Sequence, residues 1–240
     1  MNIALIGYGK MGKIIEQVAV SRGHHIKLKI DLNNLDDFNH QNFEQIDAAI
    51  EFTGPHTAYN NIIKCIEFGK PVVSGSTGWL EHLSDVEALC ESKNGSFLYA
   101  SNFSVGVNIF FEINKKLAQL MEGKHQYDVS IKEIHHTQKK DAPSGTAISL
   151  AEQILSNNSS KTNWVNDTPT AKDQLFIKSE RTDPYPGLHE VRYASSIDEI
   201  QIIHNAHSRD GFALGAVMAA EFIARRKGIF TMKDVLGFGN

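Results

Sequence analysis

The first hundred residues alternate between short apolar runs and segments with helical spacing. The apolar runs, each typical of a β-strand, are Ile3–Ile6, His25–Asp31, Asp47–Thr53, Pro71–Gly75 and Ser96–Ser101. Between them, apolar residues recur at helical spacing over Met11–Val20, about Thr57–Phe68 and about Leu80–Cys90. Strands and helices in alternation are typical of a doubly wound parallel sheet, so this part of the chain predicts an α/β fold.

The pattern changes after Asn102. The elements predicted beyond it are helices at 106–121, 147–155 and 212–226, a strand at 127–136, two strands within 189–206 and a polar loop at 156–164. A short tail follows the last helix. This order predicts a second, smaller α+β domain, with the domain boundary near Ser104.

Composition narrows the class of protein. Of the 240 residues, 41% are apolar and 22% are charged, as in a globular protein with a sizeable core, and the formal net charge is -4. Such a chain has no general electrostatic attraction for nucleic acid or anionic membranes. It shows no secretory leader, no apolar run long enough to span a bilayer, and no metal-ligand spacing at Cys65 or Cys90. We therefore expect a cytoplasmic enzyme or binding protein with two reduced, buried thiols.

A glycine motif directly follows the first predicted strand. In "IALIGYGKMGKIIEQ", Gly7, Gly9 and Gly12 form G-x-G-x-x-G at the start of the first predicted helix. Glycine at these positions permits a tight turn, lets a pyrophosphate approach the backbone and lets the helix pack on the strand, while the helix N-terminus attracts the anion. Because strand and helix flank the motif as required, it predicts a dinucleotide site.

An acidic residue closes the second predicted strand. Asp31 lies where a carboxylate binds the ribose hydroxyls of NAD, and it would repel the additional phosphate of NADP. Lys10, Lys27 and Lys29 are close in sequence and would compensate for that repulsion unless they are ordinary surface lysines. The residues favour NAD, or the use of both cofactors.

Two more loops of small residues follow predicted strands. Thr53–Pro55 and Gly75–Gly78 both lie at carboxyl ends, the edge of an open α/β sheet at which ligands bind. Either loop alone would be explained as an ordinary turn. Together with the glycine motif, they favour a ligand site along this edge.

The segment "KEIHHTQKKDAPSGTA", Lys132–Ala147, carries the groups suited to acid-base chemistry. Histidine titrates near neutral pH, and a desolvated lysine can do so too. The small residues Ser144–Thr146 precede or begin a helix, so their N–H groups are placed to bind a carboxylate. From the residues alone, a basic surface loop is an equally good interpretation.

Across nearly its whole length the chain resembles the 4-hydroxy-tetrahydrodipicolinate reductase family, also called dihydrodipicolinate reductase. The most specific likeness is "EIHHTQKKDAPSGTA", which matches the family signature E-x-H-H-x-x-K-x-D-A-P-S-G-T-A. Supporting matches are "GYGKMG", "GSTG", "ASNFSVGVN" and "HSRDGFALGA".

The resemblance implies roles for individual residues. His135 and Lys139 are implied to be catalytic, His135 as a proton donor or acceptor and Lys139 as a proton donor. Lys140 falls on a variable position of the signature and receives no role. The implied substrate-binding residues are His136, Ser144, Gly145 and Thr146. The implied cofactor-binding residues are Gly7, Tyr8, Gly9, Lys10, Met11, Gly12, Asp31, Gly75, Ser76, Thr77, Ala100, Ser101, Asn102 and Phe103. No metal is implied.

The resemblance also implies the architecture and the reaction. A Rossmann-type dinucleotide-binding domain would comprise residues 1–104 and 208–240, and a substrate-binding and oligomerisation domain would comprise residues 105–207 of a homotetramer. NADH, NADPH or either would reduce a small dicarboxylate, (2S,4S)-4-hydroxy-2,3,4,5-tetrahydrodipicolinate, to tetrahydrodipicolinate with loss of water, in lysine biosynthesis by the diaminopimelate pathway. Two alternatives stay open from the residues: another small-substrate dehydrogenase on a Rossmann scaffold, and a non-catalytic protein that senses NAD(H).

Overall fold

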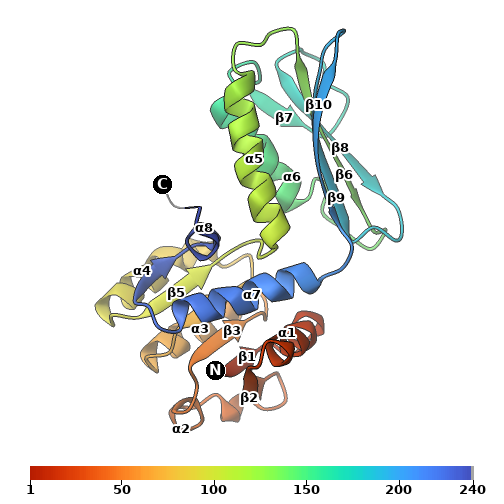
Figure 1. Ribbon diagram of the computed structural model, residues 1–240. Coiled ribbons are helices and arrows are strands. Elements are labelled where there is room, and N and C mark those ends of the chain that lie inside the picture. Colours follow the sequence, from red (N-terminus) through yellow and green to blue (C-terminus); the bar gives the residue numbers. More distant parts are fainter. Residues whose placement is uncertain (239–240) are drawn as a thin grey trace. The chain divides into compact units, whose positions relative to one another are not determined.

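Two separate β-sheets organise the protein, seen in a computed structural model that describes residues 1–238 (Figure 1). One unit contains the first sheet and comprises residues 1–105 with the segment from Arg209 onward. The other unit contains the second sheet and comprises residues 106–208. Among residues 1–238, no helix combines the length and the apolar character needed to cross a membrane.

The first sheet has six strands, all parallel, in the order β11-β5-β4-β3-β1-β2. They are β1 (Asn2–Ile6), β2 (His25–Ile30), β3 (Ala48–Glu51), β4 (Val72–Ser74), β5 (Ser96–Tyr99) and β11 (Gly228–Phe230). The predicted doubly wound parallel sheet is therefore confirmed. Strand order reverses between β1 and β3, and open α/β sheets bind ligands at the carboxyl ends of strands at such a point.

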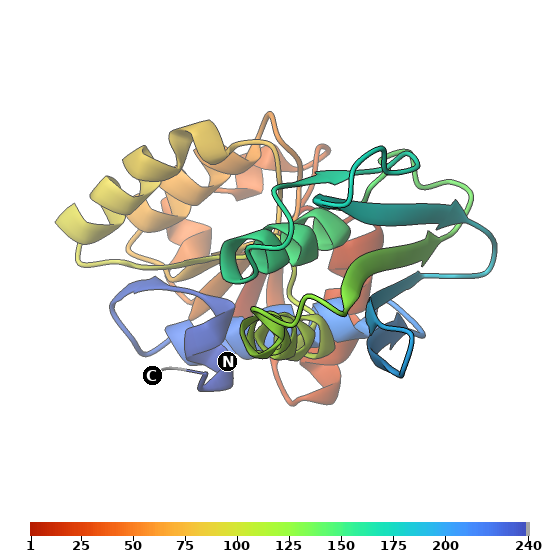
Figure 2. The ribbon, with the colours of Figure 1, turned by 90° about the horizontal axis from the view of Figure 1, so that it is seen from above.

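Both faces of this sheet are apolar because successive side chains of each strand point to opposite sides. The helices of this unit are α1 (Lys10–Ser21), α2 (His40–Phe43), α3 (Ala58–Glu67), α4 (Leu83–Ser92), α7 (Asp210–Ile223) and α8 (Met232–Leu236). Helices α1 and α7 cover one face of the sheet, and α3 and α4 cover the other (Figure 2). Ile3 and Leu5 of β1 belong to the core on the first face, whereas Ala4 and Ile6 belong to the core on the second. Cys65 and Cys90 are free and buried in the α3–α4 core, as predicted.

Two details of the first unit differ from the sequence-based expectation. The helix predicted from Leu80 begins as a 3-10 turn, Leu80–His82, before α4. The prediction of a plain tail after the last long helix was wrong, because Gly228–Phe230 forms β11 and pairs with β5. A three-residue strand is too short to show a period in the sequence.

The second sheet is mixed, in the order β10-β9-β6-β8-β7, with β9 antiparallel to both β10 and β6. Its strands are β6 (Asp128–His135), β7 (Asn163–Val165), β8 (Gln174–Arg181), β9 (Gly187–Ala194) and β10 (Glu199–Ala206), and its helices are α5 (Val105–Met121) and α6 (Gly145–Asn157). The expected α+β fold is confirmed. The loop expected over Ser156–Trp164 was partly wrong, since its first two residues end α6 and its last two residues enter β7.

The face of this sheet covered by α5 and α6 holds the third core. On β6, every second residue is buried, from Val129 through Ile131 to Glu133 and His135. The alternation that places Val129 and Ile131 under the helices therefore also turns Glu133 and His135 inward at the end of the strand. Ionisable side chains in a core need hydrogen-bond or ion-pair partners. Glu133 and His135, together with those partners, therefore define a candidate site.

Candidate active site

The glycine turn between β1 and α1 has the geometry that the motif predicts. Gly7 adopts a φ of +93°, and a Cβ there would lie 2.2 Å from the carbonyl oxygen of Phe52. A Cβ at Gly12 would lie 2.3 Å from the carbonyl oxygen of Gly7, so this close helix–strand packing requires glycine. Around Gly9, by contrast, nothing lies within 4 Å of the Cβ position. The turn therefore leaves open space where a pyrophosphate would meet the N-terminus of α1.

A pocket of about 370 Å³ adjoins this turn at the carboxyl ends of β1, β2 and β3. Its lining includes Gly7, Gly9, Asp31 and the loop from Thr53 to Thr57. Asp31 is exposed directly after β2, and its Oδ1 accepts the N–H of Leu32 at 2.9 Å. A carboxylate at the rim of a pocket beside a glycine turn fits the ribose of a dinucleotide.

Lys29, a candidate for compensating Asp31, already has partners. Its ammonium group lies 2.7 Å from Glu16 Oε1 and 3.2 Å from the hydroxyl of Tyr8, which itself donates a hydrogen bond to Glu16. The hydrogen bond with Glu16, followed by that with Tyr8, raises the pKa of Lys29. Tyr8, Glu16 and Lys29 thus form a cluster on the side of α1 and β2, which leaves Lys10 and Lys27, both exposed, as the other lysines expected to compensate for Asp31.

A buried carboxylate links the two other loops at this edge. Glu51, at the end of β3, accepts hydrogen bonds from Ser74 Oγ at 2.6 Å, Ser76 Oγ at 2.8 Å and the N–H of Thr53 at 2.8 Å. The Thr53 N–H also contacts Ser76 Oγ at 2.9 Å. Ser76 therefore turns its hydroxyl toward Glu51, and only its backbone remains for a cofactor. Glu51 fixes the Thr53 and Gly75–Thr77 loops against each other.

The predicted cofactor residues differ in their accessibility. Phe103 is buried, and its carbonyl oxygen packs so closely on α7 that a Cβ at Gly215 would lie 1.7 Å away. The exposed members of the predicted set are Gly9, Lys10, Asp31, Thr77 and Ser101, the half-buried ones are Gly7, Tyr8, Met11, Gly75, Ala100 and Asn102, and the buried ones are Gly12, Ser76 and Phe103.

The basic segment of the second unit contains an ion pair and a helix cap. Lys139 Nζ lies 2.8 Å from both carboxylate oxygens of Asp141, and its side chain is 24% exposed. Ser144 caps α6, its Oγ accepting the N–H of Ala147 at 3.2 Å. Gly145 and Thr146 form the first turn of α6, and nothing lies within 4 Å of the Cβ position of Gly145. This end of α6 has the open backbone that an anion requires.

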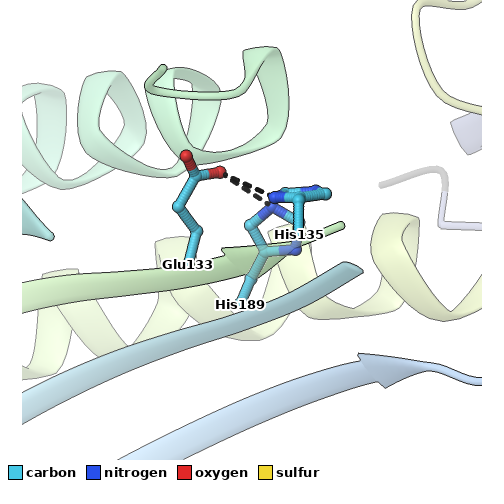
Figure 3. A group of neighbouring side chains, drawn as sticks. All are labelled: Glu133, His135 and His189. Carbon is cyan, nitrogen blue, oxygen red and sulfur yellow. Dashed lines mark ion pairs between the residues drawn. The ribbon is translucent and has the colours of Figure 1, made fainter. Parts of the chain in front are cut away.

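His135 belongs to a buried group of ionisable side chains (Figure 3). Glu133 Oε2 lies 3.3 Å from Nδ1 of His135 and 3.8 Å from Nε2 of His189, and Oε1 lies 3.0 Å from Nη2 of Arg181. Glu133 is fully buried, while the side chains of His135 and His189 are 8% and 5% exposed. His136, in contrast, is half-buried at the start of the following turn. The two adjacent histidines therefore occupy different environments.

The same group is the one place among residues 1–238 where several ligand-type side chains meet. One atom each of Glu133, His135 and His189 lies within 4.8 Å of the others. Arg181 already pairs with the carboxylate, and Ser144 Oγ lies 3.1 Å from Nε2 of His189. A cation would therefore be placed beside a guanidinium group. The expectation that no metal takes part stays a prediction.

Sequence reasoning gave no role to four of these side chains: Glu133, Asp141, Arg181 and His189. Glu133 and His189 did carry a signal, because each stands at an inward position of an alternating strand, where a charged or polar residue requires a partner. Their partners lie on β8 and in the turn before α6, and the alternation of residues along one strand does not predict which other segments lie beside it.

Comparison with known proteins points to one family. Residues 1–103 match the family model described as dihydrodipicolinate reductase, N-terminus, and residues 106–236 match dihydrodipicolinate reductase, C-terminus. A 4-hydroxy-tetrahydrodipicolinate reductase from Christiangramia forsetii is 51% identical over 236 residues, covering 98% of each chain. One from Lawsonia intracellularis is 31% identical and covers 98% of this chain and 99% of the relative.

Among solved structures, a dipicolinate-bound dihydrodipicolinate reductase from Paenisporosarcina sp. TG-14 has a TM-score of 0.76 at 22% identity, covering 96% of this chain and 97% of that one. An amine dehydrogenase from Mycobacterium smegmatis has a TM-score of 0.61 at 13% identity and covers 97% of this chain and 95% of that one. Both likenesses concern the fold.

Proposed function

Because both parts of the chain match its models, the protein belongs to the dihydrodipicolinate reductase family, and we propose that it is a 4-hydroxy-tetrahydrodipicolinate reductase of lysine biosynthesis. The single observation that carries this function is the 51% identity to a reductase of that name over 98% of both chains. The glycine turn and the basic segment supply the chemistry that the reaction needs.

The first unit binds the cofactor, NADH or NADPH. The open space at Gly9 and the N-terminus of α1 accommodate the pyrophosphate, and Asp31 accepts hydrogen bonds from the ribose hydroxyls. The exposed residues Thr77 and Ser101 follow β4 and β5 at the same edge, within the segments Gly75–Thr77 and Ala100–Phe103. When bound, the reduced cofactor supplies a hydride.

The second unit binds the substrate dicarboxylate. The N-terminal end of α6, from its cap Ser144 through Gly145 and Thr146, faces one carboxylate with the N–H groups of Gly145 and Thr146, because the N–H of Ser144 is donated to Glu133. His136 contacts the ring. We term the segment Ser144–Thr146 the carboxylate cradle. The dipicolinate bound to the reductase from Paenisporosarcina is a dicarboxylate of the same class.

The reaction consumes one hydride and one proton. The substrate loses water to give a conjugated cyclic imine, C4 accepts the hydride, and the neighbouring carbon takes a proton, giving tetrahydrodipicolinate and oxidised cofactor. Lys139, which carries an ammonium group held by Asp141, stabilises the negative charge that moves onto the ring, and Lys139 and His135 provide the proton. Positioned proton transfer of this kind contributes about 10²- to 10⁴-fold in rate.

The assembly and location follow from the same proposal. A homotetramer would cover exposed apolar side chains on the second unit, among them Ile200 and Ile203 of β10 and Ile113 of α5. Light scattering of the purified protein measures this directly. Two buried, unpaired cysteines suit the reducing cytoplasm, where the lysine pathway would operate.

A coupled assay tests the function. Pyruvate and aspartate semialdehyde are condensed by dihydrodipicolinate synthase, the purified protein is added, and the absorbance of the reduced nicotinamide is followed with NADH and with NADPH. We expect loss of absorbance only when synthase and both of its substrates are present. Turnover of an alcohol or amine with NAD⁺, with no turnover of the synthase product, would instead identify another dehydrogenase.

A further inference from the structure

Glu133 connects the proton donor of the proposed reaction with the carboxylate cradle. One carboxylate oxygen, Oε1, accepts the backbone N–H of Ser144 at 3.1 Å and Nη2 of Arg181 at 3.0 Å. The other, Oε2, faces Nδ1 of His135 at 3.3 Å (Figure 3). A single buried side chain therefore contacts both the strand that carries His135 and the residue that caps α6.

The ionised form of Glu133 is the stable one in the folded chain. Burial raises the pKa of this carboxyl, but the nearby polar groups of His135, Ser144, Ser179 and Arg181 outweigh burial and hold the pKa well below its usual range. A buried carboxylate beside Nδ1 favours the orientation of the imidazole in which that nitrogen carries the proton and Nε2 is left for other contacts. Glycine at residue 187 leaves space beside Nε2, because a Cβ there would lie only 3.1 Å from this nitrogen.

His189 supports the same two groups from the neighbouring strand. It is paired with Glu133 across β6 and β9, its Nε2 lies 3.1 Å from Ser144 Oγ, and its ring packs edge-on against His135 with centroids 5.0 Å apart. Burial, reinforced by the nearby His135, lowers the pKa of His189 to about 3. His189 is therefore a neutral hydrogen-bond partner of the cap at physiological pH and not a second proton donor.

Building on the function proposed above, we propose that Glu133 and His189 are positioning residues that couple His135 to the carboxylate cradle. Glu133 orients His135 through Nδ1 and holds the cradle through the Ser144 N–H. His189 fixes the Ser144 hydroxyl and the face of the His135 ring. The substrate bound at Ser144–Thr146 and the proton carried by His135 then keep a fixed distance and orientation, because Glu133 and His189 contact both.

A double-mutant cycle distinguishes this role from a purely structural one. The variants are Glu133→Gln, which keeps the shape and removes the charge, His135→Ala, and the combination of the two. If Glu133 acts through His135, Glu133→Gln lowers kcat by about 10- to 100-fold in the natural chain but by less than about threefold when His135 is already alanine. The Kd of NADH stays within about twofold throughout, because the glycine turn lies in the other unit.

If the two changes lower kcat by independent, multiplicative factors, Glu133 does not act through His135 and the proposed role is overturned. A purely structural effect of Glu133→Gln would give this result, because it would be the same with and without His135. A kcat within twofold of the natural chain for Glu133→Gln alone would overturn it as well.

His189→Phe tests the second positioning residue and carries the test if Glu133→Gln does not fold. Phenylalanine retains a ring beside His135 but removes the contact with Ser144. We expect the KM of the substrate and the inhibition constant of dipicolinate to rise about tenfold, with the Kd of NADH unchanged. Tyr193→Phe is the matched control: Tyr193 is a buried residue of the same strand whose hydroxyl has no hydrogen-bond partner among residues 1–238, and its loss should change neither constant.

Unchanged constants in His189→Phe, or equal changes in Tyr193→Phe, would overturn the role of His189. These outcomes are separate from failure of the proposed function. An inactive natural chain in the coupled assay refutes the reductase function, whereas an active natural chain with indifferent variants refutes the positioning role alone.

Discussion

The change in the free energy of unfolding between about pH 7.5 and about pH 5 tests whether His189 stays neutral in the folded chain. Burial, with the nearby His135, lowers the pKa of its imidazole from 6.5 to about 3. Over this pH range the unfolded chain therefore takes up a proton at residue 189 that the folded chain does not. The free energy of unfolding falls as the pH falls, because protonation favours the unfolded state.

The size of the loss follows from the two pKa values. The contribution of His189 is fully present above its unfolded pKa of 6.5 and decreases by about 1.4 kcal/mol per pH unit below it, which gives about 2 kcal/mol at about pH 5. Glu133 changes little over the same range. Its folded pKa is lowered, so its contribution is present above the usual value of 4.5 and is lost only at lower pH.

Urea unfolding at both pH values measures this loss. A Trp79→Phe background leaves Trp164 of β7 as the single tryptophan, so fluorescence reports on the second unit. We expect the chain with His189 to lose about 2 kcal/mol more between the two pH values than the His189→Phe variant. Equal losses in the two chains would refute the reasoning.

Four further predictions concern the chemistry and the cofactor. Lys139→Met should lower kcat about 10²- to 10⁴-fold with the Kd of NADH unchanged, and turnover close to that of the natural chain would show that the assigned role is wrong. Asp31→Asn should raise kcat/KM with NADPH relative to NADH by about tenfold, because the carboxylate is lost while Lys29 keeps its partners; an unchanged ratio would contradict this. Gly12→Ala places a Cβ 2.3 Å from the Gly7 carbonyl oxygen, so a fluorescence titration should show a Kd of NADH raised about tenfold, and unaltered binding would argue against the turn as the cofactor site. Exhaustive dialysis against a chelator should leave kcat unchanged; a loss of activity that zinc restores would place a metal in the reaction.

The periodicity of apolar residues predicted most of the fold, because helices cover both faces of the first sheet and both strands and helices therefore carry recognisable apolar patterns. Strands such as Asp47–Thr53 and helices such as Thr57–Phe68 were recognisable, and the structure ends them only one to three residues differently. β8 was not predicted, and β11 was expected to be tail. β8 follows a polar loop and ends in "KSER", and these polar and charged residues obscure the alternation of apolar residues along the strand. β11 has only three residues, too few for a pattern. Register and pairing, which no local pattern encodes, supplied the rest.

The candidate site divides in the same way. Ser144–Thr146 and the glycine turn could be predicted because turn and cap chemistry is local in sequence. The Glu133 cluster could not be predicted in full, because it depends on His189 lying opposite Glu133 and on Arg181 reaching across from β8. Ser76 shows the opposite case: its position in a small-residue loop was predicted, but the buried Glu51 beneath it directs the hydroxyl away from solvent.

The carbon that receives the hydride is the most direct test of the proposed reductase reaction. NADH carrying deuterium on either face of the nicotinamide C4 is supplied with freshly made 4-hydroxy-tetrahydrodipicolinate, and the product is examined by NMR. We expect deuterium at C4 of tetrahydrodipicolinate from one of the two labelled cofactors, appearing about 10²- to 10⁴-fold more slowly with a Lys139→Met chain that still binds NADH. Oxidation of the cofactor without label in the product, or equally fast labelling by the variant, would contradict the proposed reaction.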